Sequence, residues 1–214
     1  NIATSEWLRK LSRTCHEYDI LLIIDDIQVG NGRTGDFFSF EESGIKPDMV
    51  TLSKAIGGGL PMALLLFRQE LDQWKPGEHT GTFRGNNLAF VAAYETLHYW
   101  DNMDMSHAVK HKSEIMKNEI KEIAVKFPEL DAEVRGRGMI YGLEIPERGV
   151  CSQVSEKCFE NGLIIELAGA DDQVLKFLPP LIIDEETLLN GISIVEQSIG
   201  EVIEDKKKKL TEEL

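Results

Sequence analysis

The stretch "LLIIDDIQVGNGRTG", from Leu21 to Gly35, places two adjacent carboxylates between a short apolar run and a series of turn-forming residues. The apolar residues from Ile20 to Ile24 do not alternate with polar ones, which favours a strand covered on both faces in a parallel sheet. Ligands of open α/β sheets bind beyond the carboxyl ends of the strands. Asp25 and Asp26 are therefore candidates for a binding site.

Two other interpretations of the aspartates remain open from these residues alone. One carboxylate caps the next element while the other faces solvent. Alternatively both hold a metal ion, which needs further ligands at strand or helix spacing, and the neighbouring sequence offers none.

A second motif, "VTLSKAIGGGLP", runs from Val50 to Pro61. Lys54 follows another expected strand, Asp48 to Leu52, and three glycines come after it. A lysine that is partly desolvated becomes a usable nucleophile toward a carbonyl group, and glycines let the backbone pass close to a ligand. The alternative is a surface lysine before a flexible turn. A phosphate loop of the GxxxxGK type is excluded because the lysine precedes the glycines.

A third segment, "GEHTGTFRGNNLAF" from Gly77 to Phe90, gathers hydroxyl, amide and glycine residues ahead of an expected helix. Backbone N–H groups and hydroxyls before a helix N-terminus can bind an anion. The alternative is a polar loop in which Asn86 is the N-cap of that helix.

The pattern along the chain predicts an α/β part, residues 1–103, followed by an α+β part, residues 104–214. Ser5 is expected to cap a first helix from Glu6 to about Tyr18. We expect further strands at 62–67, 133–145, 163–166 and 174–178, further helices at 87–100, 104–127, 151–161 and 184–204, and a fraying tail at 205–214.

The composition excludes several classes of partner. The chain of 214 residues has a formal net charge of −14, which disfavours binding to nucleic acid and to anionic membranes. Its three cysteines lack CxxC spacing, so neither a disulfide framework nor a zinc site is indicated. The i, i+4 pair His107 and His111 is more typical of a solvated helix face than of a metal site. The lack of a membrane span and of a leader predicts a cytoplasmic protein.

The three motifs, in this order and spacing, closely resemble the class III aminotransferases, pyridoxal 5′-phosphate enzymes of fold type I, over the whole chain. "DDIQ", "TLSK" and "TFRGNN" look like the diaminobutyrate–2-oxoglutarate branch of that family. The family usually has Glu in place of Asp26 and Pro in place of Asn87, and both departures look typical of this branch. The resemblance implies the C-terminal part of the large domain, with a mostly parallel sheet, followed by the small α+β domain.

The resemblance also implies roles for individual residues. It makes Lys54 the residue that binds pyridoxal 5′-phosphate covalently and later moves a proton, and Asp25 the carboxylate that faces the pyridine nitrogen. Ile27 would pack against a face of the ring, and Gln28 would approach the phenolic oxygen. Thr82 resembles a threonine that reaches the cofactor phosphate of the other subunit, which implies a homodimer.

One substrate contact departs from the family pattern. "LKFLPPL", from Leu175 to Leu181, resembles the segment in which many relatives have an arginine that binds the substrate carboxylate, and here the residue is Lys176. Lysine keeps the charge but loses the bidentate geometry. A solvated strand residue is the alternative interpretation of Lys176.

The reaction implied is transfer of the terminal amino group of L-2,4-diaminobutyrate to 2-oxoglutarate, which gives L-aspartate 4-semialdehyde and L-glutamate. Another ω-amino acid, such as 4-aminobutyrate or ornithine, is the alternative substrate. The family's N-terminal half has no counterpart in this sequence, so an inactive truncated remnant is the alternative outside the enzyme class.

Overall fold

The computed structural model describes residues 1–82 and 84–212. The chain forms two compact units, one of residues 3–108 and one of residues 109–214 together with residues 1–2. The division falls within helix α3, Met105–Lys126. The sequence predicts a boundary slightly earlier, after residue 103.

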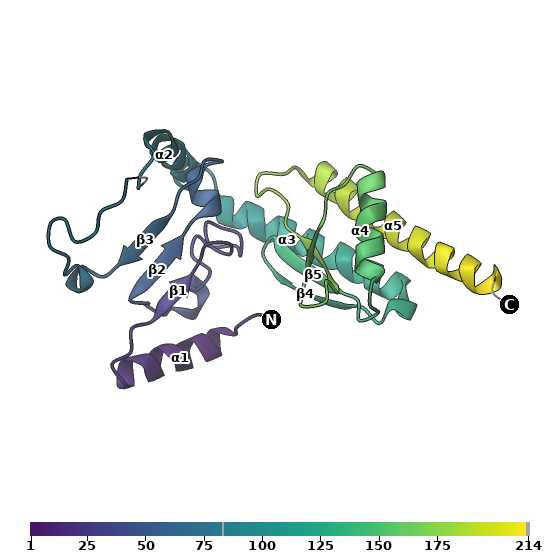
Figure 1. The fold of residues 1–214 in the computed structure, drawn as a ribbon, viewed down its shortest axis with the longest axis horizontal. Helices are drawn as coiled ribbons and strands as arrows, with labels where there is room; N and C mark the ends of the chain where they lie inside the picture. Colours follow the sequence, from purple (N-terminus) through teal and green to yellow (C-terminus); the bar gives the residue numbers. More distant parts are fainter. Residues whose placement is uncertain (83, 213–214) are drawn as a thin grey trace. The chain divides into compact units, whose positions relative to one another are not determined.

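The first unit is built on a three-stranded sheet of order β1-β2-β3. Its strands are β1 (Ile23–Asp25), β2 (Met49–Leu52) and β3 (Leu64–Phe67); β1 and β2 are parallel, and β2 and β3 are antiparallel (Figure 1). Short 3-10 helices lie at Glu41–Ser43, Lys54–Gly57 and Gln69–Leu71.

Helix α1, Ser5–Glu17, precedes β1. The prediction that Ser5 is the N-cap is wrong, because the helix begins one residue earlier than expected. Thr4 is the cap, and its hydroxyl accepts a hydrogen bond from the Trp7 N–H at 3.2 Å. This bond satisfies one of the N–H groups that the first helical turn leaves without a partner.

Strand β1 is shorter than the predicted strand from Ile20 to Ile24. The backbone N–H of Ile20 still bonds to the end of α1, at the Cys15 carbonyl oxygen, and the N–H of Leu22 donates to the Asp48 carboxylate at 2.7 Å. Both bonds divert the chain from ladder pairing, so the strand begins only at Ile23.

The two faces of this sheet differ. The buried side chains of Phe40, Val50, Leu52 and Ile56 form a small core, with Ile24 packed against it. Because side chains alternate along a strand, the neighbours of these residues in sequence point to the opposite face. Ile23 on that face is 54% exposed, so the prediction that this strand is covered on both faces is wrong for β1 in this chain.

Helix α2, Asn87–Asn102, is the second α-helix of the first unit and directly precedes α3. The Asn86 side chain accepts hydrogen bonds from the N–H groups of Leu88 and Ala89, at 3.0 and 3.4 Å. The prediction that Asn86 is the N-cap is therefore confirmed.

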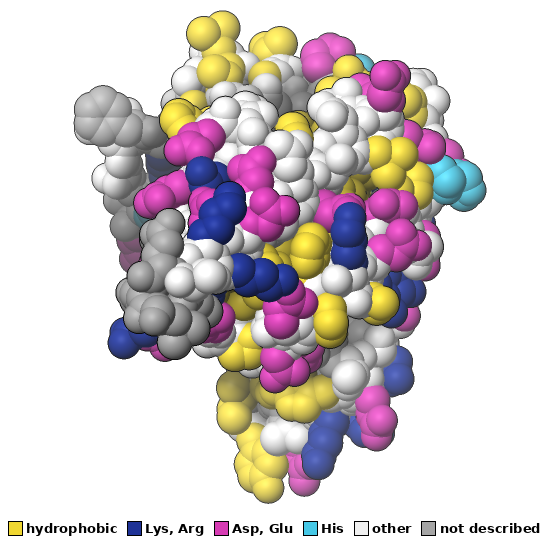
Figure 2. Space-filling model, turned by 90° about the vertical axis from the view of Figure 1, so that its right-hand side faces the viewer, with side chains coloured by type: hydrophobic (Ala, Val, Ile, Leu, Met, Phe, Trp, Pro, Cys, Tyr) yellow, Lys and Arg dark blue, Asp and Glu magenta, His cyan; other side chains and the backbone are white. Residues whose placement is uncertain are grey.

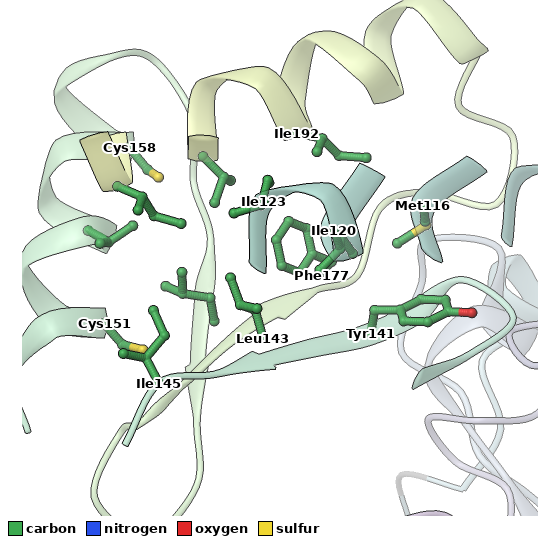
Figure 3. Close-up of a cluster of buried hydrophobic side chains, with 14 of the residues drawn as sticks. Met116, Ile120, Ile123, Tyr141, Leu143, Ile145, Cys151, Cys158, Phe177 and Ile192 are labelled. Atoms are coloured by element: carbon green, nitrogen blue, oxygen red, sulfur yellow. The ribbon is translucent and has the colours of Figure 1, made fainter. Parts of the chain in front are cut away.

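The second unit packs helices on a four-stranded antiparallel sheet of order β4-β5-β7-β6. Figure 3 shows its core, in which buried side chains from α3, the sheet and the two later helices meet. The strands are β4 (Glu133–Arg137), β5 (Ile140–Glu144), β6 (Glu166–Ala168) and β7 (Val174–Phe177), and the later helices are α4 (Val150–Glu160) and α5 (Glu185–Glu212). A 3-10 turn, Pro128–Leu130, precedes β4.

Three predictions for this unit are wrong. The single strand expected at 133–145 is a hairpin, because Gly138, with φ of +61°, turns the chain between β4 and β5. The strand expected at 163–166 begins only at Glu166, because the Leu163 N–H still bonds to the Cys158 carbonyl oxygen at the end of α4. The tail expected to fray from 205 continues α5 as far as Glu212, and residues 213–214 lie outside the described part.

The three cysteines are buried free thiols. Burial raises the pKa of Cys151 to about 11, so this thiol stays protonated at neutral pH.

The surface carries both signs of charge. On the face shown in Figure 2, acidic and basic side chains are interspersed. None of the described helices is both long enough and apolar enough to cross a bilayer.

Candidate active site

The parallel pair β1 and β2 brings two predicted site residues to one edge of the sheet. Asp25 is the last residue of β1 and lies opposite Thr51 in the register of the two strands. The Asp26 N–H donates to the Thr51 carbonyl oxygen at 3.0 Å, which fixes this register. Lys54 follows β2 by two residues, so the carboxylate and the amine both belong to the carboxyl ends of neighbouring parallel strands.

The adjacent aspartates have different environments. Asp26 is fully buried, and its carboxylate accepts hydrogen bonds from the Ser39 N–H at 2.9 Å and from the Ser39 hydroxyl. Asp25 is exposed, and its Oδ1 accepts a hydrogen bond from the Ile27 N–H at 3.0 Å. Asp26 therefore holds the loop that follows β1, and Asp25 is the carboxylate that a ligand can reach.

Replacement of Asp26 by alanine is expected to destabilise the first unit by about 2–4 kcal/mol, since it removes the buried carboxylate that accepts two hydrogen bonds from Ser39. The tryptophans of the chain, Trp7, Trp74 and Trp100, all lie in residues 3–108, so urea unfolding followed by tryptophan fluorescence reports on this unit. Asp25→Ala is the matched control and should change the midpoint much less. Equal shifts for both variants would show that burial of Asp26 does not stabilise the loop.

Lys54 is exposed and has a left-handed backbone conformation, with φ of +50°. This conformation costs a non-glycine residue of the order of 1 kcal/mol, and it is typical of functional sites and tight turns. The Ser53 hydroxyl holds the turn by donating to the Met62 carbonyl oxygen at 2.6 Å. The amine therefore projects from a fixed turn at the end of β2.

The glycines after Lys54 have a packing role. A Cβ added to Gly58 would lie 2.6 Å from the Thr96 hydroxyl oxygen and 2.9 Å from the Ala92 carbonyl oxygen, both on α2. Gly58 also has φ of +58°. Glycine thus permits the close approach of α2 to the turn that carries Lys54.

For the other three predicted cofactor residues, the structure gives the position in the chain and the exposure. Ile27 and Gln28 are half-buried in the turn directly after β1, next to Asp25 in sequence. Thr82 is exposed in the segment before α2. For Thr82, the structure offers no contact with Asp25 or Lys54 within the described ranges, and its role stays a prediction.

Lys176 belongs to the second unit, on β7. Its amine forms an ion pair with the Glu166 carboxylate on the neighbouring strand β6, with Nζ and Oε2 3.1 Å apart, and its side chain is 16% exposed. Lys176 is therefore not the solvated strand residue of the alternative interpretation. Its contact with a substrate stays a prediction.

The paired histidines are not arranged around a metal. His111 Nε2 lies 2.9 Å from the Glu185 carboxylate, in an exposed hydrogen bond between α3 and α5. Within residues 1–82 and 84–212, no three or more His, Cys, Asp and Glu side chains are grouped so that they can hold a metal ion.

Two further polar side chains, one on β2 and one in the loop after β1, were not singled out by the sequence. The buried amide of Asn31 and the buried hydroxyl oxygen of Thr51 have no hydrogen-bond partner among the described residues. Thr51 carries a sequence signal, since it lies between Val50 and Leu52, whose side chains enter the core, and therefore points to the same face as Asp25. Asn31 carries none that pattern analysis can detect.

The chain belongs to the class III aminotransferase family, whose model matches residues 1–199. Members of this family depend on pyridoxal 5′-phosphate, and the fold is that of the fold type I enzymes. The architecture and the carboxylate and amine at one sheet edge agree with this assignment.

Several curated relatives carry the name diaminobutyrate–2-oxoglutarate transaminase. That of Wolinella succinogenes is 62% identical over 212 residues, which are 99% of this chain and 50% of the relative. That of Oceanobacillus iheyensis is 53% identical over 205 residues, 95% of this chain and 48% of the relative. The chain thus spans about half the length of these relatives.

Solved structures share the fold. The ornithine aminotransferase of Toxoplasma gondii aligns with a TM-score of 0.87 at 27% identity, covering 97% of this chain and 49% of that protein. The acetylornithine aminotransferase of Elizabethkingia anophelis aligns with a TM-score of 0.84 at 29% identity, covering 94% and 53%.

Proposed function

We propose that this chain supplies the Lys54 and Asp25 half of an aminotransferase that moves the terminal amino group of L-2,4-diaminobutyrate to 2-oxoglutarate. The products are L-aspartate 4-semialdehyde and L-glutamate. The observation that carries the proposal is the placement of Asp25 and Lys54 at the ends of two paired parallel strands. The choice of substrate is supported by the name and the 62% identity of the Wolinella succinogenes relative.

The residues at the sheet edge fit pyridoxal 5′-phosphate. Asp25 offers an exposed carboxylate with Oδ1 already held by the Ile27 N–H, which suits a cationic ring nitrogen. When bound, the cofactor supplies an electron sink for the C–H bond broken at the carbon that bears the transferred amino group. Asp25 keeps the ring nitrogen protonated, because a carboxylate beside a nitrogen base favours its charged form.

Lys54 performs two tasks in this proposal. Its amine would hold the cofactor covalently, and when free it would carry a proton to and from the carbon that bears the transferred amino group, which is the terminal carbon of diaminobutyrate and Cα of glutamate. The turn, held by the bond from the Ser53 hydroxyl to the Met62 carbonyl oxygen, fixes the backbone from which the amine projects. Ile27 would pack against the ring, and the Gln28 amide would donate to the phenolic oxygen.

We propose a homodimer in which Thr82 binds the cofactor phosphate of the partner. Support comes from α2, where Leu88, Val91 and Tyr94 are 72%, 63% and 61% exposed. Large apolar side chains that gather on a surface are typical of contacts between proteins.

We also propose a cytoplasmic location. It fits the three free thiols, which persist in a reducing compartment.

We assign Lys176 to the substrate carboxylate. Its pairing with Glu166 at 3.1 Å keeps the amine in one orientation, and a single ammonium group binds a carboxylate without the bidentate geometry of arginine. Glu166 is then the residue that a substrate carboxylate competes with.

A chimera tests this function. This chain replaces the half of the Wolinella succinogenes transaminase to which it aligns, and the chimera is loaded with pyridoxal 5′-phosphate. Glutamate formation from 2-oxoglutarate is measured with L-2,4-diaminobutyrate, ornithine and 4-aminobutyrate as donors. We expect diaminobutyrate to give a kcat/KM at least tenfold above the others. A preference for ornithine or 4-aminobutyrate would assign another ω-amino acid, and a chimera that binds cofactor without any turnover would support the inactive remnant.

A further inference from the structure

The Thr51 hydroxyl is a donor without an acceptor. Its Oγ1 is shielded from solvent and forms no hydrogen bond with any residue in the described part of the chain. A buried polar group in this condition destabilises a folded protein, so such groups are rare and often belong to functional sites. The neighbours of Thr51 on its face of the sheet define which group it can serve.

Of the two residues opposite Thr51 on the neighbouring strands, Asp25 is the one whose side chain can accept a hydrogen bond. Thr51 lies opposite Asp25 on β1 and opposite Leu65 on β3. Side chains of register partners point to the same face, and adjacent strands are about 4.8 Å apart, so a rotation of the threonine side chain brings its hydroxyl within reach of the carboxylate. Leu65 has no polar side-chain atom. Ser53, which directly follows β2, already donates to the Met62 carbonyl oxygen.

Asp25 has the capacity to accept this bond. Its two carboxylate oxygens offer about four lone-pair sites, and the structure shows one bond to them, from the Ile27 N–H to Oδ1. A carboxylate that is held at one oxygen by Ile27 alone can still turn about its side chain. A second donor fixes the direction in which its charge points.

We infer that Thr51 is a positioning residue for Asp25. Its hydroxyl donates a hydrogen bond to the Asp25 carboxylate when a cationic ring nitrogen occupies the sheet edge, and it holds the carboxylate toward that nitrogen. The inference rests on the proposed function, because it needs pyridoxal 5′-phosphate at this edge. It has a specific signature: the hydroxyl strengthens cofactor binding but destabilises the cofactor-free chain.

The test compares Thr51→Val, which replaces the hydroxyl with a methyl group, and Thr51→Ser, which keeps it. Cofactor affinity is measured by absorbance titration of the chimera, and cofactor-free stability by urea unfolding of this chain, followed by tryptophan fluorescence. We expect Thr51→Val to weaken pyridoxal 5′-phosphate binding about tenfold, the effect of losing one hydrogen bond to a charged acceptor. Its cofactor-free midpoint should stay equal or rise. Thr51→Ser should keep the affinity within about twofold.

Three outcomes overturn the inference. Unchanged affinity in Thr51→Val shows that the hydroxyl does not act on the cofactor site. A lower cofactor-free midpoint in Thr51→Val shows a structural hydroxyl. Loss of affinity in Thr51→Ser shows that the methyl group, not the hydroxyl, matters. These outcomes differ from failure of the proposed function, in which the unmutated chimera itself binds no cofactor.

Discussion

Replacement of Lys54 by alanine is expected to lower the turnover of the chimera with L-2,4-diaminobutyrate by at least about 10³-fold, because it removes both the nucleophile and the proton carrier. The absorption band of the lysine-linked cofactor should disappear at the same time. Pyridoxal 5′-phosphate that still binds should do so reversibly and leave on dialysis. Lys54 is exposed, so the unfolding midpoint of the chain should not fall.

A matched lysine tests whether position or charge accounts for this loss. Lys46 is also exposed and lies before β2, whereas Lys54 follows it. Lys46→Ala should keep turnover within about twofold and keep the absorption band. A band that persists in Lys54→Ala would assign the covalent link to another lysine.

The second large effect is expected at Asp25. Asp25→Asn replaces the carboxylate with a neutral amide of nearly the same shape, and it removes the charge that stabilises a protonated ring nitrogen. Turnover should fall by about 10²–10³-fold, the range seen when a fixed electrostatic partner of a reaction is removed. Because Asp25 is exposed, the urea midpoint should change by less than that of Asp26→Ala.

The control for Asp25 is another exposed carboxylate of the same unit. Glu17 is the last residue of α1 and precedes the amino end of β1, so Glu17→Gln changes the net charge equally without altering the sheet edge. It should leave turnover unchanged. If Asp25→Asn retained full turnover, the carboxylate would not be the partner of the ring nitrogen.

Sequence patterns predict those features that depend on a few neighbouring residues. The apolar run before Asp25 predicts a parallel strand, and the rule for carboxyl ends then brings Asp25 and Lys54 to one edge. The Asn86 cap follows from local hydrogen bonding. The different fates of the two aspartates do not follow from local sequence, because the partner of Asp26 is Ser39, 13 residues away.

Tertiary contacts explain where the sequence predictions are wrong. Three glycines, Gly136, Gly138 and Gly142, lie in the segment expected to be one strand, and its sequence does not tell that Gly138 is the one at which the chain turns to form a hairpin. The apolar run from Leu163 predicts a strand, but pairing with β7 starts only at Glu166, which lies opposite Lys176. The role inferred for Thr51 depends on its hydroxyl being buried without a hydrogen-bond partner among the described residues, which is a tertiary property that the sequence does not give.

The most direct test of the central claim is the identity of the lysine that carries the cofactor. The chimera is loaded with pyridoxal 5′-phosphate, reduced with borohydride to make the link permanent, digested and analysed by mass spectrometry. We predict the phosphopyridoxyl group on Lys54, within the peptide that contains "TLSKAIGGG". A phosphopyridoxyl group on any other lysine, or none in a chimera that binds the cofactor, would contradict the account.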